Sequence, residues 1–322
     1  MAHHRLEPRG YVYTFGGQPP AFEVDDGDRI TAPTRDARGY DADYQPLLPE
    51  QMPPSEGFSY LTSNPCVGPI AVRGARPGDT LAITIEAINL TRDSAWSSQG
   101  GGMGSLTGEV PGRKLLLNEP LPDLMFDWRL DRDRMVGSLA LTNSRLEAVE
   151  IPLHPFLGSI GVAPRYGRVE TTLAPGEFGG NMDCLETRAG TTLYLPVHVA
   201  GAMLCFGDVH AAQGDGELCR SALETTAEVT LRLNVVRDWP IEWPRLEDEE
   251  WLMVAGSSRP LMEALQLAQV ELRSWLVRDY GFDPQEAWQL NSQVGRMRIG
   301  NVVDPWYTLV AKFPKRYLPA GD

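Results

Sequence analysis

Lysine is almost absent from this chain of 322 residues, in which only Lys114, Lys312 and Lys315 occur and arginine supplies the other positive charges. Hydrolytic sites of the Ser-Ser-Lys and Cys-Glu-Lys kinds need a lysine close to their nucleophile. The Gly/Ser-rich stretch 97–105 superficially suits the first kind, but Lys114 is the only lysine before residue 312. The scarcity of lysine therefore argues against both kinds of site.

Positive charge of any kind is also scarce. The chain has 29 Lys and Arg residues against 43 Asp and Glu residues, which gives a formal net charge of −14. A chain this acidic repels the phosphate backbone of DNA and RNA. We therefore expect no nucleic-acid partner.

Long apolar runs and a cysteine framework are missing as well. No apolar run reaches the roughly 18 residues that a membrane span needs, and the polar N-terminus lacks the hydrophobic stretch of a signal peptide. The four cysteines show no CxxC spacing, and a chain of this size does not need disulfides to fold. We expect a cytoplasmic protein with free thiols and no membrane partner.

Glycine and proline are plentiful, with 32 and 26 copies. One pattern recurs at 24–31, 75–88 and 187–199. In each stretch a turn ends in glycine, and a small polar residue and then an apolar strand follow it. Within 222–236 apolar and polar residues alternate, which indicates a strand with one buried face. These patterns predict a mainly β fold whose body is a jelly-roll-like β-sandwich of mostly antiparallel sheets.

Three stretches depart from this pattern. Residues 91–113 are rich in Ser and Gly, and we expect a long loop there, either one that covers a site or a plain surface insertion. Residues 259–281 place leucines and a tryptophan at helical spacing and end on glycine. A second helix is predicted over 284–292, because an aspartate and a proline stand at its start.

Candidate chemistry gathers around Asp208 and His210, in the sequence GDVHAAQGDGE. Residues two apart on a strand point the same way, so these side chains present a carboxylate and an imidazole side by side. Such oxygen and nitrogen ligands suit zinc or a similar divalent ion. Asp183 and Glu217 add carboxylates in neighbouring glycine-rich stretches. From the residues alone, a metal site and a pair that only hydrogen-bonds a turn are equally good interpretations.

Four stretches carry a resemblance to a known family: GPIAVRGARPGDTLAITIEAI (68–88), HPFLGSIGVAP (154–164), the block from GEFGGNMD to RSALET (176–225) and PKRYLP (314–319). In this order they resemble the acetamidase/formamidase family. The resemblance implies hydrolysis of the C–N bond of a small amide, similar to formamide or acetamide or a cyclic γ-lactam, to a carboxylate and ammonia or an amine. It also implies a homo-oligomer, most simply a dimer, and a bound divalent metal ion, zinc, sometimes with calcium in addition.

The resemblance and the chemical needs of amide hydrolysis together suggest roles for individual residues. Asp183, Asp208 and His210 match the family's acidic and histidine motif and are expected to hold the metal ion. Glu217 is expected to transfer protons and Asn181 to hold the substrate amide. Other substrate contacts are expected from His154, from Phe178, where some family members carry His, and from the backbone N–H groups near Gly179 and Gly180, which suit an oxyanion.

Two alternatives stay open at this point. Cys184 stands beside Asp183 as a possible nucleophile, although nothing in the sequence lowers the pKa of its thiol. The alternative from another class is a non-catalytic β-sandwich module that binds a metal ion or a small ligand. Such a module would keep Asp208 and His210 as ligands, but it would not need a proton-transferring Glu217 beside them.

After Pro244 the pattern of short strands between glycine and proline turns gives way to helical spacing. We therefore divide the chain into a β-rich catalytic body, residues 1–245, with the metal site within 179–217, and a helical C-terminal segment, residues 246–322. The linker between them is not disordered in composition. We expect the C-terminal segment to pack on the same unit and to give the fold an α+β periphery.

Overall fold

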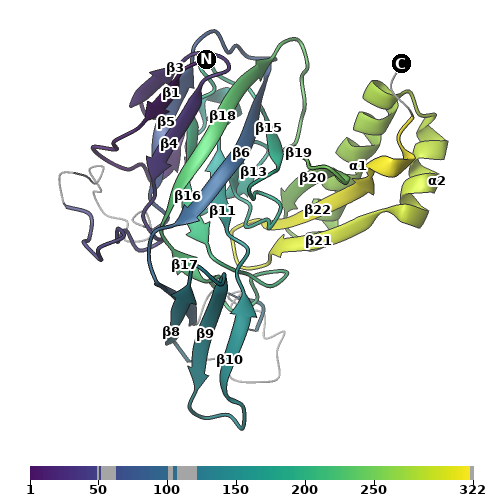
Figure 1. Ribbon diagram of the computed structural model, residues 1–322. Helices are drawn as coiled ribbons and strands as arrows, with labels where there is room; N and C mark the ends of the chain where they lie inside the picture. The colour runs from purple at the N-terminus through teal and green to yellow at the C-terminus, as the bar shows by residue number, and fades with distance from the viewer. Residues whose placement is uncertain (49–50, 52–62, 101–103, 107–121, 320–322) are drawn as a thin grey trace, which may run out of the picture.

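Two large sheets form the body of the protein, and two helices lie at one side of it (Figure 1). The computed structural model describes residues 1–48, 51, 63–100, 104–106 and 122–319. Within these residues the fold is mainly β and its strand pairs are mostly antiparallel, as the sequence predicts. Neither helix among the described residues is long and apolar enough to cross a membrane.

The first sheet has nine strands within the described ranges. Its order is β1 (His3–Arg5), β4 (Arg29–Pro33), β18 (Ala227–Val236), β6 (Thr80–Leu90), β15 (Thr192–Pro196), β19 (Arg245–Glu247), β20 (Trp251–Ser258), β22 (Tyr307–Pro314) and β21 (Arg296–Asn301). Three of its strands, β4, β6 and β15, follow the recurring glycine turns. Gly27, Gly78 and Gly190 in those turns have φ values of 89°, 96° and 89°, a region that glycine enters at little cost.

The second sheet has eleven strands in the part of the chain that the structure describes. Nine run in the order β10 (Glu147–Pro152), β9 (Val136–Leu141), β8 (Leu124–Asp131), β7 (Ser94–Gln99), β17 (Glu224–Thr225), β16 (Leu204–His210), β11 (Phe156–Gly161), β14 (Gly179–Asn181) and β13 (Pro175–Gly176). The other two are β5 (Cys66–Val72), which pairs with β16, and β3 (Phe22–Val24), which pairs with β5. A small separate sheet pairs β2 (Thr14–Phe15) with β12 (Glu170–Thr171).

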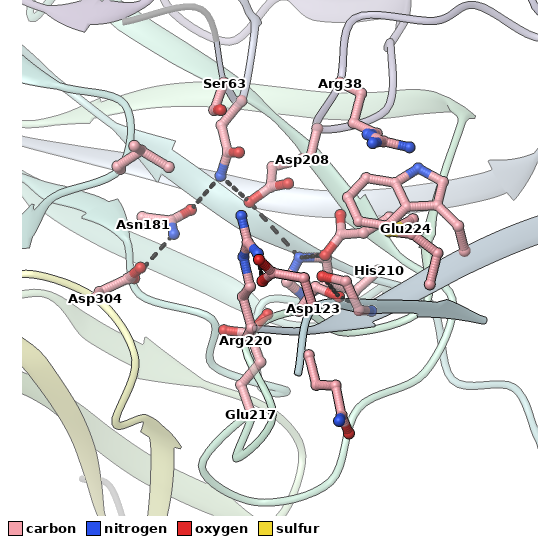
Figure 2. Close-up of a pocket in the computed structure, with 18 of the residues that line it drawn as sticks. Arg38, Ser63, Asp123, Asn181, Asp208, His210, Glu217, Arg220, Glu224 and Asp304 are labelled. Atoms are coloured by element: carbon pink, nitrogen blue, oxygen red, sulfur yellow. Dashed lines mark hydrogen bonds and ion pairs between the residues drawn. The ribbon is translucent and has the colours of Figure 1, made fainter. Parts of the chain in front are cut away.

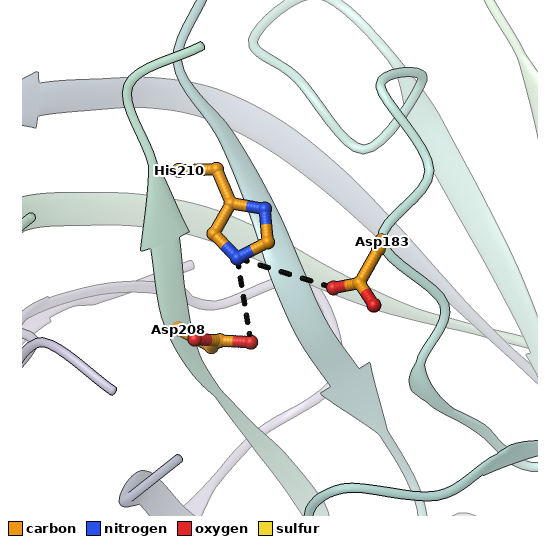
Figure 3. Close-up of side chains that lie close together, drawn as sticks. All are labelled: Asp183, Asp208 and His210. Carbon is orange, nitrogen blue, oxygen red and sulfur yellow. Dashed lines mark ion pairs between the residues drawn. The ribbon is translucent and has the colours of Figure 1, made fainter. Parts of the chain in front are cut away.

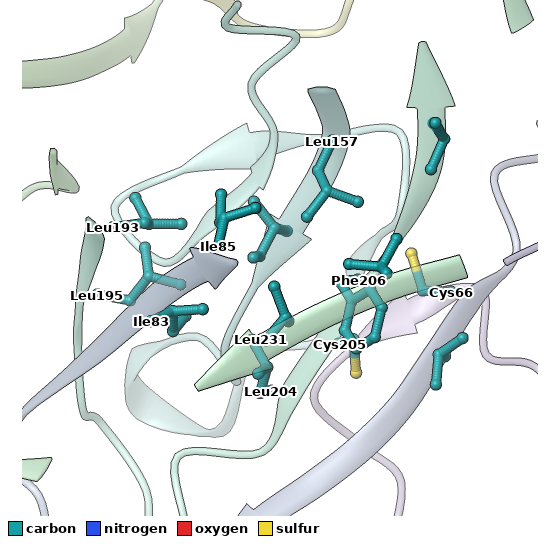
Figure 4. Packing of buried hydrophobic residues seen from close by; sticks show 14 of the residues in the cluster. Cys66, Ile83, Ile85, Leu157, Leu193, Leu195, Leu204, Cys205, Phe206 and Leu231 are labelled. Carbon is teal, nitrogen blue, oxygen red and sulfur yellow. The ribbon is translucent and has the colours of Figure 1, made fainter. Parts of the chain in front are cut away.

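The main core lies between the two sheets (Figure 4). Ile83 and Ile85 from β6 and Leu231 from β18 meet Leu157 from β11 and Phe206 from β16, and none of these side chains is exposed. Burying one such side chain stabilises a fold by about 1.5–3 kcal/mol. The alternating apolar residues of β6 and β18 therefore form one wall of this core.

Two predictions about the strands of the β-rich body differ from the structure. The stretch 222–236 is not one strand, because β17 joins the second sheet and β18 the first. Alternation marks the buried face of a strand but not the sheet to which it belongs. The expected loop over 91–113 is wrong at β7, which pairs with β8 and β17. Residues 101–103 and 107–113 of that expected loop lie outside the described residues.

The C-terminal segment carries the two predicted helices, α1 (Leu261–Tyr280) and α2 (Pro284–Val294). Gly281 ends α1 in the left-handed conformation, and the Asp283 side chain accepts hydrogen bonds from two N–H groups in the first turn of α2. The segment is not wholly helical, because β20, β21 and β22 extend the first sheet (Figure 1).

A buried arginine joins α1 to the sheet. Arg245, 1% exposed, lies 2.7 Å from Glu271 of α1 and 3.2 Å from Asp279. Its guanidinium also lies over the rings of Trp239 and Trp275, at 5.0 and 4.8 Å. The charge is therefore paired on its polar side and covered by aromatic rings on the other.

Candidate metal centre

Strand β16 brings Asp208 and His210 together, as the sequence predicts. His210 Nε2 lies 3.6 Å from Asp208 Oδ2 and 3.9 Å from Asp183 Oδ1 (Figure 3). Asp183 follows β14, which is connected to β16 through β11. All three side chains are buried. They form a compact group of one nitrogen and two oxygen ligand atoms, each within 4.8 Å of the others.

Two glutamates extend the group on the other side of the imidazole. Glu224 Oε1 lies 3.4 Å from His210 Nε2, and Glu217 shares a second set of ligand atoms with Glu224 and His210, again within 4.8 Å. Glu217 and Glu224 are 7% and 3% exposed. His210 is therefore a member of both sets of ligand atoms, which overlap at its imidazole.

The backbone is strained where these acids stand. Asp183, Asp208 and Glu217 have φ values of 46°, 56° and 50°, in the left-handed region that costs residues with a Cβ roughly 1–2 kcal/mol each. The strain is concentrated at the residues that make up the cluster, a pattern typical of functional sites.

Gly158 of β11 lies directly beneath the group. A Cβ at this position would stand 2.7 Å from Asp208 Oδ2, 2.8 Å from Asp183 Oδ1 and 2.8 Å from the His210 ring. These separations are shorter than van der Waals contact, so any larger residue would push into the space between the ligand atoms. Glycine is required here because it leaves that space open.

Gln213 determines which His210 nitrogen carries a proton. The Gln213 amide nitrogen donates to the carbonyls of Asp183 and Gly300, both at 2.9 Å. Its amide oxygen is thereby turned toward His210 Nδ1, at 2.9 Å, where it can only accept. Nδ1 must therefore be protonated, and the lone pair of a neutral imidazole is on Nε2, facing the carboxylates.

Several buried carboxylate oxygens have no hydrogen-bond donor among the described residues: Asp183 Oδ1, Asp208 Oδ1 and Glu224 Oε2. Burying a carboxylate without a partner is unfavourable, and it is unusual in a folded protein. Burial, together with neighbouring carboxylates, raises the pKa of Glu217, Glu224 and Asp304 well above their usual values. Burial and the charge of Asp208 likewise raise the pKa of Asp183 to about 6. A divalent cation would satisfy these oxygens, so the residues present fit a metal ion.

A cavity of about 430 Å³ opens onto the cluster (Figure 2). Asp208, His210, Glu217, Glu224 and Asp304 line its interior. Toward the rim the lining changes to arginine, aromatic and apolar side chains, namely Arg38, Trp96, Leu124, Met125 and Arg220. A small molecule entering this cavity would meet the buried acids and the imidazole at its inner end.

Asn181 lines the cavity, but its polar atoms are engaged by the protein. Its amide nitrogen donates to Asp183 at 3.2 Å and to Asp304 at 2.8 Å, and its oxygen accepts from Asn64 at 3.2 Å and from Ser159. The structure therefore places Asn181 as a support for two carboxylates of the cluster.

Four predicted substrate contacts do not reach this cavity. Phe178 is buried against Phe15, with ring centroids 5.3 Å apart. Gly179 and Gly180 pair with β11, where added Cβ atoms would strike backbone oxygens at 2.4 and 2.3 Å. Their glycine pair therefore serves close strand packing. The His154 side chain is exposed, and the residue is not among those that line the cavity.

Sequence reasoning missed several residues of the site, and the cluster extends beyond the expected range 179–217. The missed residues are Asn64, Gly158, Ser159, Gln213, Glu224 and Asp304. The only sequence signal for Gly158 and Ser159 was their place in HPFLGSIGVAP, and for Gln213 its place in GDVHAAQGDGE. Asp304 comes from the C-terminal segment, where no local pattern marks it.

The C-terminal segment also orders the turn that carries Glu217. The N–H of Gly216 donates to Ile299 at 2.9 Å, and the N–H of Val302 donates to the Gly216 carbonyl at 3.0 Å. Since Asp304 and the carbonyl of Gly300 belong to the same segment, β21 and the turn after it complete one side of the site.

Comparisons with known proteins agree with one another. The sequence model of the Acetamidase/Formamidase family matches residues 167–313. A crystal structure of acetamidase from Yersinia enterocolitica is 33% identical, with a TM-score of 0.83 and coverage of 99% of this chain and 93% of that chain. A formamidase from Methylophilus methylotrophus is 26% identical over 213 residues, and an acetamidase from Mycolicibacterium smegmatis 28% over 253 residues. These matches cover 53% and 59% of this chain, and they span about half to three-fifths of the relatives, 51% and 61%.

Proposed function

The chain belongs to the acetamidase/formamidase family, and from this membership and the buried cluster we propose that it hydrolyses the C–N bond of a small amide with the help of a divalent metal ion. The substrate class includes open-chain amides and cyclic γ-lactams, and the products are a carboxylate and ammonia or an amine. The observation that carries the proposal is the convergence of Asp183, Asp208 and His210 on one point, where Asp208 and His210 line the inner end of the cavity.

These three side chains would hold the ion. His210 offers Nε2, because Nδ1 is engaged by Gln213, and each aspartate keeps one oxygen without another donor in the described structure. One imidazole nitrogen with two carboxylate oxygens is a donor set that suits zinc, whereas calcium prefers oxygen ligands alone. We therefore propose zinc.

Amides resist hydrolysis because resonance weakens the carbonyl as an electrophile and because an amine leaves poorly. A bound divalent ion lowers the pKa of water and polarises a carbonyl. We assign the proton transfers to Glu217, and its position supports this, since it lines the cavity beside the group and belongs to the set that shares His210. Burial, and next the charge of Asp183, raise the pKa of Glu217. A raised pKa favours the protonated carboxyl, which suits delivery of a proton to the leaving nitrogen.

Nucleophilic catalysis by Cys184 is a poor alternative. Its thiol is buried, and burial raises the pKa of that thiol well above its usual value. A buried neutral thiol is a weak nucleophile. The two lysines within the described residues do not suit lysine chemistry either, because Lys312 is paired with Glu186 and Lys315 lies 2.7 Å from Glu247. Lys114 lies outside the described residues.

The test is to measure metal content and ammonia release on the same preparation, over a panel with formamide, acetamide and a γ-lactam. We expect zinc bound at about one equivalent, loss of turnover after chelation, and loss of both metal and turnover in Asp208→Asn and His210→Ala. Glu217→Gln should keep the metal and lose turnover. Asp215→Asn is the matched control, because Asp215 lies in the same turn but is exposed and pairs with Arg298.

Two results would contradict the proposed reaction, and a third would contradict the proposed ligand set. Full turnover by the metal-free protein would exclude the metal mechanism. Metal and amide binding without ammonia release from any amide would favour the non-catalytic module. Loss of metal in Glu224→Gln but not in Asp183→Asn would move the ion to the second set, formed by His210, Glu217 and Glu224.

A further inference from the structure

Arg38 stands at the rim of the cavity (Figure 2). The side chain is exposed, and among the described residues no carboxylate lies within ion-pair distance of its guanidinium. The guanidinium lies over the Trp96 ring, 5.1 Å from its centroid. Such stacking orients the planar group and leaves its N–H donors available.

The support beneath Arg38 is tied together by one buried carboxylate. Asp36, 2% exposed, accepts hydrogen bonds from the backbone N–H groups of Arg38 and Tyr40, both at 3.0 Å. Its second oxygen accepts from Trp96 Nε1 at 3.3 Å and from Arg92 at 2.9 Å. One buried carboxylate therefore holds both the turn that carries Arg38 and the ring on which its guanidinium lies.

This support is linked to the metal cluster. Trp96 of β7 is directly opposite Glu224 of β17, and side chains of directly opposed residues lie on the same face of a sheet. Glu224 in turn lies 3.4 Å from His210 Nε2. Arg38 is thus separated from the cluster by little more than one aromatic side chain, and both face the same cavity.

The cavity is larger than formamide or acetamide requires. Cavities of roughly 300–1,000 Å³ accommodate drug-sized ligands, and this one measures about 430 Å³. A molecule of three or four heavy atoms would occupy only its inner end and would not reach the rim. The remaining space is bounded by Trp96 and by the apolar side chains Leu124 and Met125.

The distribution of charge sets the orientation of a ligand. The inner end holds Asp208, Glu217, Glu224 and Asp304, which repel an anion. At the rim Arg220 already faces Asp123 at 3.4 Å, so its charge is partly compensated. Arg38 has no such partner among the described residues and is therefore the better anion site. Its guanidinium can bind a carboxylate with two parallel hydrogen bonds.

Building on the proposed amide hydrolysis, we propose that the substrate is an amide with a carboxylate at its far end, and that Arg38 binds this carboxylate while the amide group reaches the metal cluster. Arg38 is then a specificity-determining residue. Its contact is uniform binding of ground and transition states, so its loss should raise KM more than it lowers kcat.

The experiment compares monoamides of succinic, glutaric and adipic acid with the corresponding diamides, which have the same length and no charge. For the wild-type enzyme we expect kcat/KM for at least one of the monoamides to exceed that for its diamide. In Arg38→Gln this advantage should fall by about 10–100-fold, mainly through KM, while kcat/KM for the diamide changes less than about threefold. Arg134→Gln is the matched control, because Arg134 is exposed on the turn after β8, outside the residues that line the cavity.

An equal loss for monoamide and diamide in Arg38→Gln, or no preference in the wild type, would overturn this inference. Hydrolysis of formamide alone would also overturn it and would leave the proposed function standing. If the metal-loaded protein hydrolyses no amide, the proposed function fails by itself. In that case the role of Arg38 is tested by titration calorimetry with glutaric acid monoamide on the wild type and on Arg38→Gln. Equal affinities would reject that role, and weaker binding by Arg38→Gln would support it.

Discussion

Gln213 and His210 form the hydrogen bond on which the chemistry of the cluster depends. Gln213 Oε1 lies 2.9 Å from His210 Nδ1, and its amide nitrogen is committed to two carbonyls. The amide cannot be reversed without placing an N–H against the Nδ1 hydrogen and an oxygen against two carbonyl oxygens. The orientation of Gln213 therefore keeps Nε2 available as a ligand.

We predict that Gln213→Glu and Gln213→Leu weaken zinc binding by about 10–100-fold, as is typical when the partner of a metal-binding histidine is lost. The glutamate keeps an acceptor for Nδ1 but loses both donors, so its charge would face the carbonyls of Asp183 and Gly300. Competition with a chromophoric chelator measures the affinity. Unchanged affinity in both variants would show that the His210 orientation is maintained by other contacts.

Gly158→Ala should abolish metal binding while the protein still folds, because the new Cβ would stand 2.7–2.8 Å from Asp208 Oδ2 and Asp183 Oδ1. Gly214→Ala is the control, since a Cβ at Gly214 meets nothing within 4 Å and the residue does not have a positive φ. Metal content and circular dichroism of both variants check this expectation. Retention of zinc by Gly158→Ala would contradict it.

The metal-free protein should lose stability as the pH rises. Burial and Asp208 raise the pKa of Asp183 to about 6. For His210, burial lowers the pKa, but the charges of Glu224 and Asp208 outweigh it and raise the value to about 10. A pKa that is higher in the folded than in the unfolded state adds stability at low pH, and this is lost as the pH rises through the folded value.

For Asp183 that loss falls between about pH 4 and 6, and for His210 between about pH 6.5 and 10. Metal ions reverse the trend, because they bind the deprotonated ligands. With a chelator present, we expect Tm to fall by roughly 5 °C or more between pH 5 and pH 9, and the gain from added zinc to be larger at pH 9. A chelated Tm that rises over this range would contradict the assignment.

Arg245→Met should destabilise the protein by about 3–5 kcal/mol, because it leaves Glu271 buried without its partner at 2.7 Å. The double variant Arg245→Met/Glu271→Met should recover most of that loss, since apolar side chains of similar size replace the whole pair. Arg134→Met breaks an exposed pair with Glu150 and should cost less than about 1 kcal/mol. Urea unfolding measures all three variants, and a double variant no more stable than Arg245→Met would contradict the pairing argument.

Local features could be predicted because their causes are local. The glycine turns at Gly27, Gly78 and Gly190 depend on one residue's φ, and the Asp283 cap depends on hydrogen bonds within three residues. The pairing of Asp208 with His210 follows from their two-residue spacing on β16. Even there the φ of Asp208, 56°, was not predictable, because nothing in the residue types on either side of it calls for the left-handed conformation.

By itself the sequence determined the strand-rich class, the two helices, the family and the Asp208–His210 pair, since each depends on neighbours along the chain or on motif residues in order. Four relationships emerged from the folded chain alone: Glu224 belongs to the site, Phe178 belongs to the core, 222–236 divides between two sheets, and Asp304 and Arg38 reach one cavity. These relationships join segments far apart in the chain. Local periodicity says which face of a strand is buried, but sheet pairing determines what that face meets.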